Sequence, residues 1–284
     1  MTFRKVIALA AAFCAAAALF AAEPAARPIR LVTHRGESGD APENTVPAFE
    51  LAWKRGAAWA VETDVRVTSD GELVCCHDAS AERTGGADLP IAKTTFAELR
   101  KLDFGKWKGE KFAGTPIPKL TEVLRTLPPH GHIFVELKTG VNDNFARKFA
   151  AAVHSSGVKP EQVTFISFSR NLLKAVHKFF PAYRRLWIVS IKPGTGQPET
   201  AEEIVKILKE DGLNGADMAA PWQIRMDFFS EAFIQTFHDA GFEAHFWTFD
   251  LPEQAKVLFD RGADSVTTNR SQRVMDGIRK LSGK

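Results

Sequence analysis

The sequence predicts an α/β protein, a closed TIM-type (β/α)8 barrel with a small insertion after the second barrel strand. Three observations carry this prediction. Eight apolar, β-branched runs occur along the 284-residue chain, with helical patterns between them. Hydrophobic residues make up 45% and charged residues 25%, the balance of a folded globular protein. One long segment between the second and third runs breaks the alternation, as an insertion into a barrel would.

The expected barrel strands are eight short apolar runs. They are Arg30–His34, Trp59–Asp64, His132–Lys138, Val163–Ser167, Leu186–Ser190, Gly215–Ala219, Glu243–Thr248 and Asp264–Thr267. Helical periodicity predicts helices between them at Thr45–Arg55, Asn142–Ser155, Asn171–Phe179, Thr200–Glu210, Ser230–Asp239 and Pro252–Asp260. The first helix has Phe49, Ala52 and Trp53 on one face, and Gly56 just past its end is a stop signal.

The expected insertion covers about residues 65–118. Its Thr68-Ser69-Asp70-Gly71 segment is a turn signal between Val65–Val67 and Glu72–Cys76, which predicts a β-hairpin. The rest of the insertion is rich in Gly, Lys and Pro, with a single short helix near Thr95–Leu102. We expect the insertion to lie over one end of the barrel.

The first 22 residues differ from the rest and form a predicted secretory signal peptide. Arg4 and Lys5 precede the uncharged, alanine-rich segment Val6–Phe20. This apolar core is shorter than the roughly 20 residues that span a bilayer, so no stable membrane span is expected in the mature form. Residues 23–284 would then be the secreted or periplasmic barrel domain, although the pattern leaves the cleavage site undefined.

Charge and cysteine content argue against a nucleic-acid-binding protein and against a disulfide-stabilised one. The net charge of +3 would fall to +1 with the loss of Arg4 and Lys5, so no bulk electrostatic footprint for nucleic acid is expected. Any attraction for anions must be local. Cys75 and Cys76 are adjacent on an expected strand and face opposite sides, which argues against a disulfide and predicts two small buried hydrophobes.

Three acidic residues on two neighbouring strands are candidates for a metal site. Glu62 and Asp64 lie two apart and face the same side of their strand, and Glu136 ends the next barrel strand. Because neighbouring strands lie about 4.8 Å apart, the three carboxylates could share one cation that removes their repulsion. An oxygen-only set suits Mg²⁺ or Ca²⁺, with Mn²⁺ also possible, rather than zinc. The alternative is a set of solvated acids or an ion pair between Glu136 and Lys138.

Histidine, arginine and lysine residues complete a set suited to phosphodiester chemistry. His34 and Arg35 end the first strand, and His77 follows the hairpin. Histidine exchanges a proton near neutral pH, and arginine offers a planar fork to phosphate oxygens. Most candidates fall at carboxyl ends of expected strands, where TIM-type barrels carry their active sites: His34, Glu62, Asp64, Glu136 and Lys138. Residue types alone therefore predict a metal-dependent phosphoester or sugar-processing enzyme.

An ordered series of short motifs runs through the chain after the leader. The motifs are His34-Arg35-Gly36, Pro42-Glu43-Asn44-Thr45, Glu62-Thr63-Asp64-Val65, Asp70-Gly71, His77-Asp78, Arg83-Thr84, Lys111-Phe112-Ala113-Gly114, Ile117-Pro118, Val135-Glu136-Leu137-Lys138, Ser167-Phe168-Ser169 and Trp247-Thr248. This series resembles the signature of the glycerophosphodiester phosphodiesterase family.

The resemblance implies metal-dependent hydrolysis of glycerophosphodiesters to glycerol phosphate and an alcohol. The implied catalytic residues are His34 and His77. The implied metal ligands are Glu62, Asp64 and Glu136, and the implied phosphate-binding residues are Arg35 and Lys138. It does not imply which histidine is the acid and which the base. It also leaves open whether water attacks directly or a glycerol hydroxyl first closes a cyclic phosphate.

Two further residues would support the site. Glu43 would hold His34 and Arg35 or the metal shell, unless its motif is structural and Asn44 and Thr45 cap the first helix. Trp247 would form an apolar wall for the glycerol or alcohol group, unless it packs in the barrel core.

Two alternative functions remain open at this level. The first is a lysophospholipase D-like or other phospholipid phosphodiesterase on the same barrel. Four aromatic residues of the insertion would then either fill its core or form an apolar lip for a lipid chain: Phe96, Phe104, Trp107 and Phe112. The second is a catalytically inactive binding protein, which a missing metal ligand or histidine would favour, and none is missing. The sequence does not indicate an oligomeric state.

Overall fold

A computed structural model describes residues 27–192, 194–196, 198–220 and 225–283. The expected signal peptide, residues 1–22, lies outside these ranges. Within them, no helix combines the length and the hydrophobicity that a membrane crossing requires.

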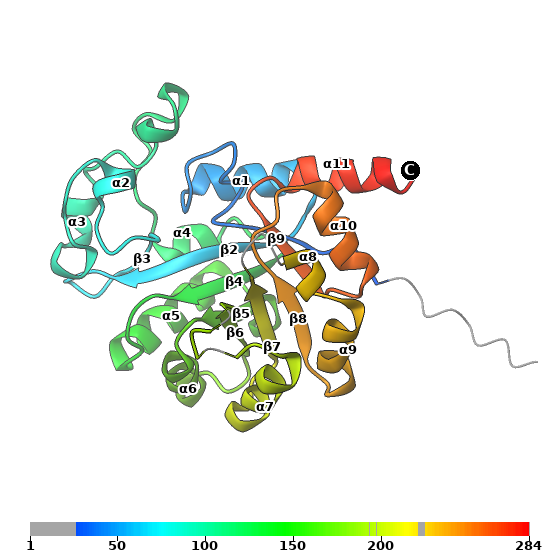
Figure 1. Ribbon diagram of the computed structural model, residues 1–284. Coiled ribbons are helices and arrows are strands. Elements are labelled where there is room, and N and C mark those ends of the chain that lie inside the picture. Colours follow the sequence, from blue (N-terminus) through cyan, green and yellow to red (C-terminus); the bar gives the residue numbers. More distant parts are fainter. Residues whose placement is uncertain (1–26, 193, 197, 221–224, 284) are drawn as a thin grey trace, which may run out of the picture.

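Eight parallel strands form a closed barrel, which confirms the predicted fold (Figure 1). The strands are β1 Leu31–Thr33, β2 Ala58–Val67, β4 His132–Leu137, β5 Val163–Ser167, β6 Arg184–Ser190, β7 Gly215–Ala219, β8 Glu243–Phe246 and β9 Ser265–Thr268. They follow one another in this order around the ring, and β1 closes it by pairing with both β2 and β9. Each expected barrel strand lies within three residues of an observed one at both ends.

Long helices pack around the outside of the ring. They are α1 Val46–Arg55, α5 Asp143–Ser156, α6 Arg170–Phe179, α7 Ala201–Asp211, α9 Glu231–Asp239, α10 Pro252–Asp260 and α11 Ser271–Leu281, with the short helices α4 Leu120–Leu124 and α8 Arg225–Phe228. The helix α11 was not predicted. Val274, Ile278 and Leu281 recur at helical spacing, so the sequence carries a periodic signal for α11 that the prediction missed.

The barrel interior and the helix–barrel interface are separate apolar clusters. The larger cluster lies between the helices and the outer faces of the strands, and the interior cluster contains Val32, Ala60, Phe134, Ile166, Leu186 and Ile188. Inward and outward residues alternate along each strand. On β2 the inward series that begins at Ala60 therefore continues with Glu62 and Asp64, which carries two acids toward the carboxyl end of the barrel.

The predicted hairpin is present, because β2 runs beyond the ring and pairs with the antiparallel strand β3, Leu73–Cys75. Gly71 in the connecting turn has φ +81°, a conformation that glycine adopts without steric strain. Cys75 and Cys76 are free and buried on opposite sides, Cys75 in the large cluster and Cys76 in a separate insertion core. Their prediction as small buried hydrophobes is confirmed.

The rest of the insertion contains more helix than the single short one expected. It forms α2 Glu82–Gly85, α3 Phe96–Leu99 and three 3₁₀ turns at Ile91–Lys93, Lys106–Lys108 and Glu110–Phe112. The helix predicted near Thr95–Leu102 is present as α3. The prediction missed α2 and the three 3₁₀ turns because elements of three or four residues are too short to produce a periodic pattern. Figure 1 shows the insertion beside the C-terminal end of β2.

The insertion's aromatic residues divide between core and surface. Phe104 is buried in the insertion core, and Phe96 packs against that core. Phe112 is half-buried, while Trp107 is 41% exposed. Two of the four aromatic side chains are therefore used for packing within the insertion.

Candidate active site

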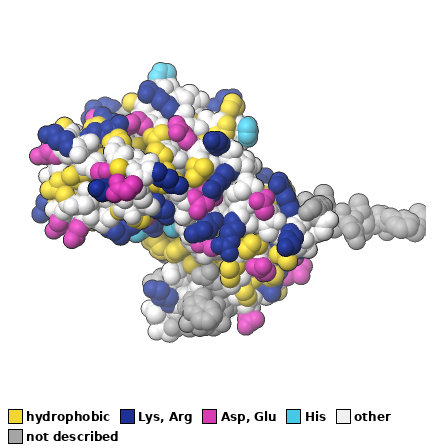
Figure 2. Space-filling model, turned by 90° about the horizontal axis from the view of Figure 1, so that it is seen from above, with side chains coloured by type: hydrophobic (Ala, Val, Ile, Leu, Met, Phe, Trp, Pro, Cys, Tyr) yellow, Lys and Arg dark blue, Asp and Glu magenta, His cyan; other side chains and the backbone are white. Residues whose placement is uncertain are grey.

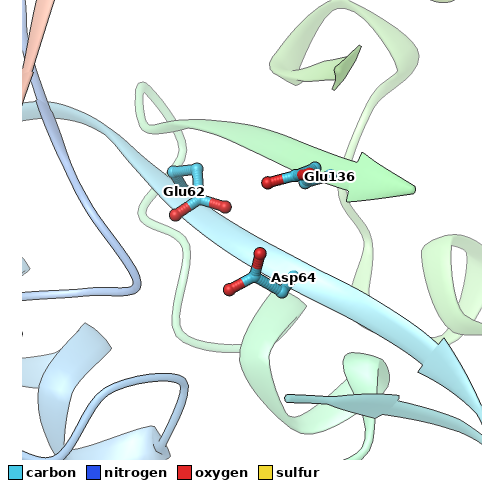
Figure 3. Close-up of side chains that lie close together, drawn as sticks. All are labelled: Glu62, Asp64 and Glu136. Atoms are coloured by element: carbon cyan, nitrogen blue, oxygen red, sulfur yellow. The ribbon is translucent and has the colours of Figure 1, made fainter. Parts of the chain in front are cut away.

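Glu62 and Asp64 of β2 and Glu136 of β4 point toward one another (Figure 3). The parallel register pairs Asp64 with Glu136, which brings the two strands' acids together. One oxygen atom from each residue lies within 4.8 Å of the other two, and all three side chains are buried. Burying three carboxylates together is unfavourable unless positive charge compensates them. The fold thus assembles the trio that the sequence spacing predicted.

The electrostatics of the trio fit a divalent cation. Burial, and then repulsion from Asp64 and Glu136, raises the pKa of Glu62 well above its ordinary value. Burial, and then the charge of Asp64, raises the pKa of Glu136 to about 7. Burial also opposes ionisation of Asp64, but nearby cations outweigh it and lower the pKa of Asp64 to about 2. Glu62 Oε1 and Asp64 Oδ1 are buried without a hydrogen-bond partner among the described residues.

Lys138 and Arg35 supply the positive charge beside the trio. Lys138 Nζ lies 2.6 Å from Glu136 Oε1 and 3.3 Å from Asp64 Oδ1. Arg35 Nε lies 3.3 Å from Asp64 Oδ2, and the Arg35 backbone N–H donates to Glu62 Oε2 at 2.8 Å. The ion pair between Glu136 and Lys138, which was the alternative to a metal site, is therefore present as part of a larger charge cluster.

His34 follows β1, and its ring is oriented by Asn269. His34 Nδ1 lies 2.8 Å from Asn269 Oδ1. The Asn269 side-chain amide donates to Asp250 Oδ2 at 2.7 Å, so Asn269 Oδ1 is the acceptor that faces the ring. His34 then carries its proton on Nδ1, and Nε2, which no described residue hydrogen-bonds, is an acceptor. Burial, and then the charge of Arg35, lowers the pKa of His34, so its ring is neutral at pH 7.

His77 has an acidic partner instead. Its Nδ1 lies 2.7 Å from Asp78 Oδ1, and Arg83 of α2 donates to Asp78 Oδ2 at 2.5 Å. Burial opposes ionisation of Asp78, but its bonds to Arg83 and His77 lower the pKa of Asp78 to about 2. An ionised aspartate in this position orients the imidazole and compensates the positive charge of its protonated form.

Glu43 connects Arg35 with the insertion. Glu43 Oε1 accepts from Arg35 at 2.9 Å and from Arg83 at 2.8 Å, and Oε2 accepts from Arg83 at 2.9 Å. A carboxylate between two guanidinium groups holds Arg35 in a fixed orientation at the pocket wall. Of the roles considered for Glu43, the contacts match support of Arg35.

Asn44 supports Asp64 and does not cap α1. Asn44 Nδ2 donates to Asp64 Oδ2 at 2.8 Å, while Oδ1 accepts from the backbone N–H of Asp64 at 3.1 Å. Its φ of +56° lies in the left-handed region, which asparagine tolerates better than most residues. Thr45 occupies the N-cap position, but its hydroxyl donates to the Pro42 carbonyl. The alternative interpretation is therefore correct in placing Thr45 at the N-cap, but neither Asn44 nor Thr45 caps the helix with its side chain.

A cavity of about 140 Å³ joins these groups at the carboxyl end of the barrel. Its polar lining consists of His34, Arg35, Glu62, His77, Glu136, Lys138, Asp217 and Thr267, and its apolar lining of Ile166, Phe168, Ile188 and Trp247. The Trp247 indole N–H donates to the Asp217 carbonyl at 3.1 Å, and its ring meets Phe168 edge-on. Trp247 also packs against the interior cluster, so it serves as pocket wall and barrel packing together.

Four residues of the site were not predicted from the sequence. Asn269 and Asp250 lie in loops that follow β9 and β8, and only closure of the barrel brings them beside His34. Arg83 lies within the motif series, so that series could have identified it. Asp217 is the only charged residue in the predicted strand Gly215–Ala219, and its alternation with small residues is a signal that could have found it.

Lysine and arginine residues are interspersed with aspartate and glutamate over the face seen in Figure 2. The overall charge of the chain is also low, at +3. The positive groups Arg35 and Lys138 inside the cavity are therefore a local feature of the site.

Known proteins share both the sequence and the fold of this chain. The glycerophosphoryl diester phosphodiesterase family matches residues 34–273. The glycerophosphodiester phosphodiesterase of Caldanaerobacter subterraneus subsp. tengcongensis is 28% identical over 264 residues, which cover 88% of this chain and 98% of the relative. A Bacillus subtilis protein of the same name is 28% identical over 255 residues, 85% of this chain and 83% of its own length.

A solved structure is also similar. An Oleispira antarctica phosphodiesterase in complex with the product sn-glycerol-3-phosphate has a TM-score of 0.76 and 27% identity, covering 88% of this chain and 96% of that chain. A parallel barrel with buried acids, two histidines and two cations at its carboxyl end suits phosphodiester hydrolysis, and these relatives place the chain among the phosphodiester hydrolases. Within that class, the chain belongs to the glycerophosphoryl diester phosphodiesterase family, and the resemblance carried by its motifs is confirmed.

Proposed function

We propose that this enzyme hydrolyses glycerophosphodiesters to glycerol phosphate and an alcohol, using one divalent cation held by Glu62, Asp64 and Glu136. The observation that carries the proposal is the buried trio, in which Glu62 Oε1 and Asp64 Oδ1 accept no hydrogen bond from the described residues. Glu62 and Glu136 of the trio line the same cavity as both histidines. Mg²⁺ and Ca²⁺ suit such ligands, and Mn²⁺ is also compatible. When bound, the cation would supply positive charge for the phosphoryl oxygens.

In this mechanism His34 is the general base and His77 the general acid. Neutral His34 accepts a proton at Nε2 from the attacking oxygen as that oxygen bonds to phosphorus. His77, held by Asp78, donates a proton to the alcohol oxygen as its bond to phosphorus breaks. Transfers of this kind each contribute roughly 10²–10⁴-fold to the rate.

Arg35 and Lys138 are the phosphate-binding residues in this proposal. Both line the cavity, and each is held against a carboxylate of the trio. With the carboxylates compensated by a cation, both groups can direct N–H donors to the nonbridging oxygens, where charge builds up in the transition state.

A small diester fits the insertion better than a lipid does. The apolar lip considered for a lysophospholipid would need the insertion's aromatic side chains, but Phe104 is buried and Phe96 packs against the insertion core. Within the described ranges, four side chains make up the apolar lining of the cavity. An inactive binding protein is disfavoured because the acids, histidines and cations expected for catalysis converge on one cavity.

The test is hydrolysis by the purified chain followed by ³¹P NMR. Glycerophosphocholine should yield glycerol phosphate with Mg²⁺, Ca²⁺ or Mn²⁺ and none with chelator. Full activity in chelator would refute the metal role, and a preference for lysophosphatidylcholine would refute the small substrate. A transient cyclic phosphate signal would identify attack by the glycerol hydroxyl.

We also propose that the protein acts outside the cytoplasm, as a secreted or periplasmic enzyme. The proposal is supported by the charge and apolar pattern of residues 1–22. Expression of the full chain in a bacterium, followed by fractionation and N-terminal sequencing, tests it. Recovery of unprocessed protein from the cytoplasm alone would contradict it.

A further inference from the structure

Asp217 lies across the barrel from the carboxylate trio. The strand β7 that carries it is four strands from β2 in either direction around the ring of eight. Its register partners are Ile188 on β6 and His245 on β8, both of which are buried. The Asp217 side chain nevertheless lines the same 140 Å³ cavity as Glu62. A small molecule in this cavity can therefore meet the phosphate-binding groups on one side and Asp217 on the other.

One oxygen of the Asp217 carboxyl has no hydrogen-bond partner among the described residues. The residue is 3% exposed, and Oδ1 is buried with no hydrogen bond to any residue in the described ranges. Burial raises the pKa of Asp217 to about 7, although His245 opposes this shift. A buried polar group left unpaired destabilises a protein by about 1–3 kcal/mol. Packing of the native chain alone does not explain why such an unpaired group is kept.

Within the described residues, the polar groups next to Asp217 do not hydrogen-bond to its carboxyl. His245 is already engaged on both sides, with Nδ1 2.7 Å from Ser265 Oγ and Nε2 3.1 Å from Glu243 Oε2. The Trp247 indole donates to the backbone carbonyl of Asp217 and not to its carboxyl. The carboxyl instead shares the cavity wall with the apolar side chains of Ile188 and Trp247.

We propose that the Asp217 carboxyl binds a free hydroxyl of the substrate's glycerol group and so selects glycerol diesters over phosphodiesters that lack a hydroxyl. This inference rests on the proposed function. A glycerol group offers C–H surface to Ile188 and Trp247 and hydroxyls to a carboxyl that can donate as well as accept. A site that hydrogen-bonds a substrate hydroxyl rejects analogues without one, because its polar group is then left unpaired.

The test compares two substrates on matched variants in the presence of Mg²⁺ or Ca²⁺. In Asp217→Leu, kcat/KM for glycerophosphocholine should fall at least about 10-fold, while kcat/KM for bis(p-nitrophenyl) phosphate stays unchanged or rises. Asp217→Asn, whose amide still donates and accepts, should keep most of the preference. Because the leucine removes an unpaired polar group, its melting temperature should equal or exceed that of the wild type. Asp217→Ala replaces the leucine variant if that protein does not fold.

The control is Asp264→Asn, at the opposite end of the barrel. Asp264 bonds to His238 at 2.9 Å and to the Ala244 backbone N–H at 2.8 Å, so its change should lower the melting temperature and leave the substrate preference intact. If kcat/KM in Asp217→Leu falls equally for both substrates, or falls for neither, the proposed role of Asp217 is overturned. If kcat/KM for glycerophosphocholine falls as far in Asp217→Asn as in Asp217→Leu, Asp217 recognises a cation and not a hydroxyl. That result would also overturn the proposal. A wild type that does not cleave glycerophosphocholine would instead refute the proposed function.

Discussion

The two histidines of the cavity have chemically different hydrogen-bond partners. His34 donates to the neutral amide of Asn269, whereas His77 donates to the carboxylate of Asp78. A neutral partner does nothing to retain a proton on the ring, while a carboxylate compensates the charge of the imidazolium. This difference is the physical basis for proposing His34 as base and His77 as acid.

Replacing either histidine should remove one proton transfer without disturbing the fold. For His34→Ala and for His77→Ala we expect kcat for glycerophosphocholine to fall roughly 10²–10⁴-fold. The shift in melting temperature on adding Mg²⁺ should remain, because neither residue belongs to the trio. ³¹P NMR and thermal unfolding measure the two quantities. Turnover close to the wild-type rate would contradict the assigned role.

Asn269 should act on the rate through the orientation of His34. Asn269→Leu keeps the side-chain size but removes the acceptor for Nδ1, so kcat should fall about 10–100-fold, as for other residues that orient a catalytic group. KM should change little. The control Asn144→Leu loses a bond to the Gly71 carbonyl in the hairpin, far from the ring, and should keep the wild-type kcat. Similar rates for both variants would rule out the orienting role.

At the scale of elements, β2 has two functions. Its first half belongs to the barrel and presents Glu62 and Asp64, and its last residues pair with β3 to begin the insertion. The insertion then returns Arg83 to the site, where it contacts Asp78 and Glu43. One strand thus connects the acids in the barrel with the outer partners of His77 and Arg35.

The acids of β2 should carry the metal response of the protein. Glu62→Gln keeps the shape of the side chain but removes its charge, so the rise in melting temperature with Mg²⁺ or Ca²⁺ should be lost along with activity. Glu50→Gln, an exposed residue of α1, is the matched control and should keep the full shift. Equal shifts in both variants would count against the site.

At the scale of the whole molecule, metal-free stability should depend on pH through Glu136. Its raised pKa means that the folded protein holds this proton more tightly than the unfolded chain. The resulting contribution to stability is present below the ordinary value of 4.5 and is lost as pH rises through about 7. In chelator, the wild type should therefore lose stability between pH 4.5 and 7 relative to Glu136→Gln.

Denaturant titrations of both proteins across this range measure that difference. Metal affinity should change in the opposite sense and rise through about pH 7, because the cation must displace the proton of Glu136. Isothermal titration with Ca²⁺ at pH 6 and pH 8 tests this. Parallel stability curves for the two proteins would show that Glu136 does not titrate in this range.

Local periodicity predicted most of the fold, and its failures fall on α11 and on the shortest elements of the insertion. The strands Val163–Ser167 and Gly215–Ala219 were predicted at their observed bounds because each is a compact run between turn signals. In the insertion, α2 and the three 3₁₀ turns were missed because three or four residues are too few to show a period. The helix α11 was missed although Val274, Ile278 and Leu281 recur at helical spacing. Packing against the rest of the chain stabilises these elements, and a short window of sequence does not contain it.

The sequence by itself determined the barrel and the acids, histidines and cations that line its carboxyl end. Residue spacing sets which side chains share a face, and parallel strands bring their ends to one edge. Only the tertiary structure decided their partners: Asn269 for His34, Arg83 for Asp78 and Glu43, and Asp217 on the opposite wall. Those pairings depend on closure of the ring and return of the insertion, which join residues distant in the chain. No local pattern encodes such contacts.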